Sequence, residues 1–198
     1  SLSGVVDSQV IPNAIFQPLG FITFLIASTA ELNRSPFDIT EAESELVAGY
    51  MTDYSSMKFG LFYLGEFMAT IASSAIIVTF YFSGWRGPSF IPSEIWFLAK
   101  WIGVIAIFIW FRATFPRLRI DQIMSLAWKG LFELSLINVL VLALMIAIWP
   151  DPTGMQLLLM TAINWIVFLA SVYIFGKILS PNLTGNKIKK RSVIYGLD

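Results

Sequence analysis

The 198-residue sequence contains no cysteine and no histidine. Without cysteine, the chain can form no disulfide and cannot ligate an iron–sulfur cluster through thiolates. Without histidine, it lacks the commonest metal ligand and the usual proton carrier near neutral pH. No other metal-ligand spacing is present, so we predict no metal site. Any proton chemistry must use carboxylates, lysines, tyrosines and water.

Charge is also scarce. Charged residues make up 13% of the chain and hydrophobic residues 57%, whereas soluble domains carry about 25% charge. The sequence is therefore too apolar for a water-soluble protein, and its net charge of zero argues against a nucleic-acid partner. It begins Ser-Leu-Ser, without a Met or a charged leader. We therefore expect the middle of a longer chain, either truncated or processed, and not a signal peptide.

Apolar runs long enough to span a bilayer recur along the chain. A crossing helix needs roughly 20 apolar residues, and lipid forces backbone polar groups to pair within the helix. The sequence predicts an all-α, polytopic transmembrane bundle of about five helices, forming a single membrane domain over 1–198. The predicted helices cover 13–30, 59–82, 95–111, 130–149 and 155–176.

Basic residues orient these helices. Arg86 and Lys100 belong to one side, and the other eleven lysines and arginines fall in the loops 31–58 and 112–129 and in the tail from Lys177. The positive-inside rule places these loops and the tail in the cytoplasm, or in the matrix or stroma of an organelle.

A long acidic loop follows the first predicted helix. Because Glu41 and Glu45 are four residues apart, they would share a helix face. Like charges and partial burial raise the pKa of carboxyl groups, which favours proton exchange near neutral pH. The alternative is a solvated loop, although Pro36-Phe37 favours packing against a neighbour. The ionisable residues of this loop are Glu31, Arg34, Asp38, Glu41, Glu43, Glu45 and Asp53.

Glu66 lies inside the second apolar run, on the order of 10 Å below the interface at 1.5 Å per residue. A charge at that depth costs at least a few kcal/mol unless it is paired or neutralised. We therefore predict a proton site there, the alternative being a protonated core acid. Glu133 and Lys100 are near helix ends, and we interpret both as structural, with Lys100 extending its head outward.

The second basic loop carries Arg112, Arg117 and Arg119. One interpretation is a topology signal with lipid headgroup contacts. The other is ion pairing with the acidic loop, for which the planar guanidinium is well suited. Both can hold together.

Two stretches resemble a known family. They are AELNRSPFDITEAESELVAGYMTDYSSMKFGLFYLGEF and WFRATFPRLRIDQIMSLAWK. They are similar to the signatures of the H-type membrane subunit (NADH dehydrogenase subunit 1 type) of proton-pumping NADH:quinone oxidoreductase, respiratory complex I. They occur in the expected order with the expected helix between them, and the resemblance covers about Pro18 to Trp149.

The resemblance implies a membrane subunit that helps to form the quinone chamber and couples quinone reduction to proton translocation. The chain would be part of an enzyme and not a catalyst by itself. The implied proton path comprises Glu31, Asp38, Glu41, Glu43, Glu45 and Glu66. The residues implied for the chamber loops are Arg34, Phe37, Arg112, Arg117 and Arg119.

The resemblance also implies the partners. Quinone, either ubiquinone or menaquinone, would be the substrate, and iron–sulfur clusters and flavin would reside only in partner subunits. Those partners are the hydrophilic quinone-site subunits and neighbouring membrane subunits, together with lipid. We expect the bacterial inner membrane, with the mitochondrial inner membrane or a plastid membrane as alternatives.

The sequence departs from the family pattern in places. Only the last four of about eight crossings are present, followed by an extra fifth, so the resemblance implies that the chain is the C-terminal part of a longer subunit. Glu133 stands where the family often has proline, and Asp53 where glutamate is common. Three alternatives stay open: a subunit of a related energy-converting hydrogenase, a stand-alone proton-coupled transporter, and a purely structural anchor.

Overall fold

The computed structural model describes residues 2–9, 11–33, 35–38, 53–88, 90–150, 152 and 154–195, with side chains described as far as Lys177. Within these residues every regular element is a helix, which confirms the predicted all-α class. Four helical stretches are long and apolar enough to cross a membrane: Met57–Tyr81, Ser93–Thr114, Ile120–Ile148 and Gly154–Lys177. The chain is an integral membrane protein.

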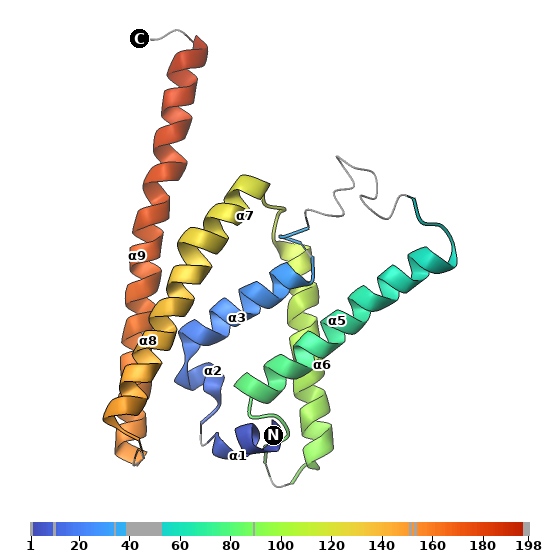
Figure 1. The fold of residues 1–198 in the computed structure, drawn as a ribbon, viewed down its shortest axis with the longest axis vertical. Helices are drawn as coiled ribbons and strands as arrows, with labels where there is room; N and C mark the ends of the chain where they lie inside the picture. Colours follow the sequence, from blue (N-terminus) through green and yellow to red (C-terminus); the bar gives the residue numbers. More distant parts are fainter. Residues whose placement is uncertain are drawn as a thin grey trace. The chain divides into compact units, whose positions relative to one another are not determined.

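The best-packed part of the chain is built from α3 (Pro18–Glu31), α5 (Met57–Tyr81) and α6 (Ser93–Thr114). Helices α5 and α6 cross and pack against each other (Figure 1). Each begins and ends within three residues of the bounds that its apolar run predicts. Their shared core consists of Leu25, Leu32, Ile77, Val78, Val104 and Phe108. The core holds the second half of α5 and leaves its first half exposed.

The first predicted helix differs from the structure. Instead of one helix over 13–30, the chain forms α2 (Asn13–Phe16) and then α3, separated by Gln17 at φ −131° and ψ 70°. Pro18 explains the break, because proline disfavours helical geometry in the residue before it and is well accommodated in the first turn of the next helix. With 14 residues, α3 is shorter than a full crossing.

The fourth predicted helix begins earlier than expected. Residues 112–129 were predicted as a loop, but α7 (Ile120–Leu126) continues through the π-helical turn η2 (Ala127–Leu131) into α8 (Phe132–Ile148). The Arg119 backbone N–H donates to the Gln122 side chain at 3.1 Å, which helps to start α7. The basic loop is therefore shorter than its charges suggest.

Side chains distant in sequence cap the C-terminal end of α5. Gln9, which follows α1 (Leu2–Ser8), donates to the Phe80 carbonyl at 2.9 Å, and Asn13 donates to the same oxygen at 2.9 Å. The Lys100 ammonium donates to the carbonyls of Phe82, Gly84 and Arg86 at 2.7, 3.0 and 2.8 Å. The structural interpretation of Lys100 agrees with these contacts, which join α6 to the end of α5.

The chain separates into two compact units, Ser1–Val139 and Leu140–Asp198. The second contains the end of α8 and α9 (Gly154–Tyr195), whose 42 residues extend well beyond the predicted end at 176. At 1.5 Å per residue α9 would be about 63 Å long, roughly twice the hydrocarbon thickness of a bilayer. The single membrane domain stays a prediction.

Candidate functional site

The end of α3 positions the start of the acidic loop. Leu32 is buried in the core, and Asn33 adopts a left-handed conformation at φ 47° that turns the chain out of the helix. Asparagine is among the residues that tolerate this conformation best. Phe37 is buried and Asp38 half-buried, whereas Glu31 is exposed at the last position of α3. Two apolar side chains therefore anchor a segment that carries acids.

The two predicted loops meet. The Ser35 hydroxyl donates to the Phe115 carbonyl at 3.2 Å, and the Leu118 N–H donates to the Pro36 carbonyl at 3.0 Å. Ser35 and Pro36 precede Phe37 and Asp38, and Phe115 and Leu118 flank Arg117. The structure thus brings the acidic segment and the basic segment together through backbone carbonyls. Ion pairing between their side chains stays a prediction.

The predicted chamber arginines have different positions. Arg112 lies in the last turn of α6, where a cation interacts favourably with the helix dipole. Arg117 and Arg119 lie on the segment between α6 and α7, and all three are exposed. The remaining predicted site residues, Arg34, Glu41, Glu43 and Glu45, lie outside the described residues.

Glu66 is the tenth residue of α5, roughly 14 Å along the helix from Met57 at 1.5 Å per residue. Both of its carboxylate oxygens are shielded from solvent, although the residue as a whole is half-buried. The Thr70 hydroxyl donates to its backbone carbonyl at 3.0 Å. A β-carbon placed at neighbouring Gly65 would meet no atom of the described chain within 4 Å, so that face of α5 is open.

The first half of α5 and the residues just before it carry an aromatic surface that was not predicted from the sequence. The rings of Phe59 and Tyr63 lie 4.9 Å apart, and those of Tyr54 and Phe62 lie 5.0 Å apart. A cavity of about 400 Å³ is lined by Tyr54, Lys58, Leu61 and Phe62. Flat apolar molecules bind sites that combine aromatic walls with a few polar groups. The four-residue spacing of aromatics was the available signal in the sequence.

Known proteins are similar to this sequence over most of its length. A family model described as NADH dehydrogenase matches residues 1–143. The chain belongs to the NADH dehydrogenase family.

Curated relatives in this family carry the name of the H-type subunit of NADH-quinone oxidoreductase. The protein from Dehalococcoides mccartyi strain ATCC BAA-2266 is 45% identical over 177 residues, which is 89% of this chain and 49% of that protein. The protein from Syntrophotalea carbinolica is 47% identical over 144 residues, covering 72% of this chain and 43% of that protein. The chain thus spans about half the length of the curated relatives it matches, or less.

Proposed function

We propose that this chain acts as a quinone-chamber-forming membrane subunit of a proton-pumping NADH:quinone oxidoreductase. In this role it couples quinone reduction to proton translocation through a path of carboxylates. The names of its relatives support the enzyme class, and the junction of an acidic with a basic segment supports the site.

One observation carries the proton role. In a helix long enough to cross the membrane, both carboxylate oxygens of Glu66 are shielded from solvent. Holding an ionised carboxylate in such a place costs several kcal/mol unless charges or hydrogen bonds compensate. We infer that Glu66 takes up and releases a proton when nearby charge changes, which is the property that a coupling residue requires.

The size of that dependence can be estimated. One unit charge appearing about 10 Å away, at an effective dielectric constant of about 20, changes the energy of a carboxylate by about 1.7 kcal/mol. A change of about 1.4 kcal/mol alters an equilibrium constant tenfold. Reduction of a quinone to a quinol takes two electrons, supplied by a partner subunit, and two protons, supplied in this proposal by acids at the chamber. The acids that give up these protons become negatively charged, and that charge can drive proton uptake at Glu66.

The remaining roles follow from the same proposal. Glu31, Asp38, Glu41, Glu43 and Glu45 carry protons between the chamber and Glu66. Arg34, Phe37, Arg112, Arg117 and Arg119 belong to the chamber loops on the cytoplasmic side. The electrons come from an iron–sulfur cluster in a hydrophilic partner subunit, since this chain has neither cysteine nor histidine. Flavin also resides in a partner subunit. Neighbouring membrane subunits complete the membrane part of the enzyme, and the membrane is the bacterial inner membrane.

Replacing Glu66 by glutamine in the assembled enzyme tests the proposal. Glutamine keeps the shape and removes the titratable proton, and positioned proton-transfer groups contribute about 10²–10⁴-fold to rates. We expect NADH-dependent quinone reduction to fall at least about tenfold while the subunits still purify together. Glu133→Gln is the matched control, because Glu133 is also an acid within a membrane-long helical stretch, Ile120–Ile148, but its side chain is exposed. Unchanged turnover and pumping in Glu66→Gln would refute the role.

A further inference from the structure

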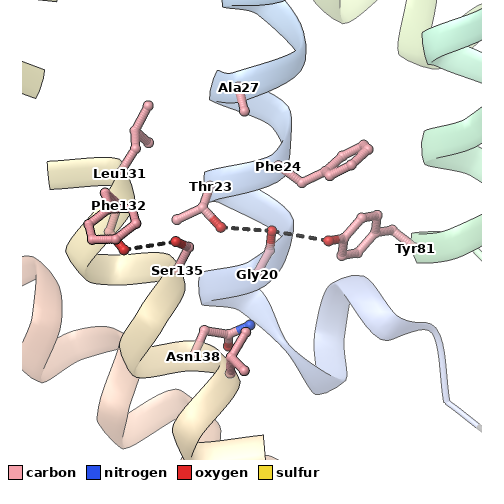
Figure 2. Close-up of a pocket in the computed structure, with 10 residues that line it drawn as sticks. Gly20, Thr23, Phe24, Ala27, Tyr81, Leu131, Phe132, Ser135 and Asn138 are labelled. Atoms are coloured by element: carbon pink, nitrogen blue, oxygen red, sulfur yellow. Dashed lines mark hydrogen bonds between the residues drawn. The ribbon is translucent and has the colours of Figure 1, made fainter. Parts of the chain in front are cut away.

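A cavity of about 350 Å³ lies on a different part of the first compact unit, between α3, the end of α5 and the η2–α8 stretch (Figure 2). Its walls carry polar side chains from three directions, none of them charged: Thr23 from α3, Tyr81 from α5, and Ser135 and Asn138 from α8. Polar groups at membrane depth usually mark a function or a specific partner.

Each of the three hydroxyl groups already donates its proton to a backbone carbonyl. Thr23 donates to the carbonyl of Leu19 at 2.9 Å and to that of Gly20 at 3.0 Å. Tyr81 donates to the Gly20 carbonyl at 3.2 Å, and Ser135 donates to the Phe132 carbonyl at 2.8 Å. A hydroxyl has one proton but two lone pairs. Each of the three oxygens can therefore still accept a hydrogen bond.

Asn138 adds both donors and an acceptor. Its amide lies against Gly20, where an added β-carbon would be 2.9 Å from Nδ2, so the absence of a side chain at Gly20 makes room for it. Among the described residues, no hydrogen bond of the Asn138 side chain is found. An amide without hydrogen bonds is costly in hydrocarbon, which means that a molecule in the cavity has to supply its partners.

We propose that this cavity is a water-binding site inside the membrane region, with Asn138 as its central ligand. A lipid acyl chain supplies no hydrogen bond, and a quinone carbonyl supplies only an acceptor, for which the hydroxyl lone pairs have no use. Water both donates and accepts, so it can pair with the three hydroxyl oxygens and with both ends of the amide. The cavity, at about 350 Å³, is far larger than the space that a single water requires.

Cysteine accessibility in the assembled complex, held in its native membrane, tests the site, and the chain's own lack of cysteine makes each introduced thiol unique within it. The probe is the small water-soluble reagent 2-aminoethyl methanethiosulfonate, which reacts with thiolate and so requires a hydrated thiol. Ser135→Cys places the thiol at the cavity wall. Leu136→Cys is the matched control, since Leu136 is the next residue of α8, is 52% exposed and does not line the cavity.

We expect the thiol at position 135 to react at least about tenfold faster than the thiol at position 136, because the thiolate forms only where water is present. Adding Asn138→Leu should remove most of that difference. Equal slow rates at both positions would overturn the proposal and indicate lipid in the cavity. If Ser135→Cys fails to assemble, Thr23→Cys gives the same comparison. The measurement needs no electron transfer, so its result does not depend on whether Glu66 exchanges a proton.

Discussion

Replacing Lys100 by methionine should destabilise the chain substantially. The ammonium donates to three carbonyls of the segment that follows α5, those of Phe82, Gly84 and Arg86, at 2.7 to 3.0 Å. It also lies 5.5 Å from the centre of the Trp96 ring. Hydrogen bonds to charged groups contribute about 1.5–3 kcal/mol each. Gly84 is buried while Arg86 is exposed, so in the variant water can replace the lost hydrogen bond to the Arg86 carbonyl but not the one to the Gly84 carbonyl. Discounting each bond to about 1 kcal/mol predicts a loss of about 3 kcal/mol in the free energy of unfolding.

Equilibrium titration with sodium dodecyl sulfate in mixed micelles measures this loss, with tryptophan fluorescence and ellipticity as probes. Lys129→Met is the control, because Lys129 is an exposed lysine in η2. Methionine fills the volume of the lysine stem, so the difference between the variants reports the ammonium contacts. A Lys100→Met variant within about 0.5 kcal/mol of the parent, the range of ordinary surface substitutions, would refute the reasoning.

Three further substitutions test the packing of α6. The Trp101 indole N–H donates to the hydroxyl of fully buried Ser74 at 2.8 Å. Trp101→Phe should therefore lower the free energy of unfolding by about 1 kcal/mol in the same titration. An unchanged free energy of unfolding would show that this hydrogen bond does not form. Gly87→Ala should cost about 1–3 kcal/mol, because the added methyl would overlap the Trp96 indole. Gly103→Ala meets no atom within 4 Å and should be neutral or stabilise the helix by up to about 1 kcal/mol. If Gly87→Ala lowered the free energy of unfolding less than Gly103→Ala does, the close packing of Trp96 against Gly87 would be contradicted.

Long apolar runs, each with only one charged residue well inside it, made α5 and α6 predictable, because a membrane helix needs only length and hydrophobicity. Two features that depend on only a few residues, the break before Pro18 and the start of α7, were predicted wrongly. Pro18 was visible near the start of the first run, yet the break before it followed from local backbone geometry that hydrophobicity does not report. The basic residues between 112 and 129 suggested a loop, although arginine and lysine are good helix formers and α7 begins at Ile120.

The site was only partly predictable. The acids and arginines were visible as charges, but nothing local indicated that Ser35 would hydrogen-bond to Phe115, which is 80 positions away. Polar side chains inside apolar runs, such as Asn138, were signals that sequence analysis did not use. Their importance depends on which helices they face, and that information exists only in the tertiary structure.

Redox-induced infrared difference spectroscopy on the assembled enzyme tests the central claim most directly, because a protonated carboxyl has a carbonyl-stretch band that disappears on ionisation. We predict that reducing the quinone pool changes such a band, and that the change is lost in Glu66→Gln and retained in Glu133→Gln. Identical difference spectra for the parent and Glu66→Gln would contradict the claim that Glu66 exchanges a proton during quinone reduction.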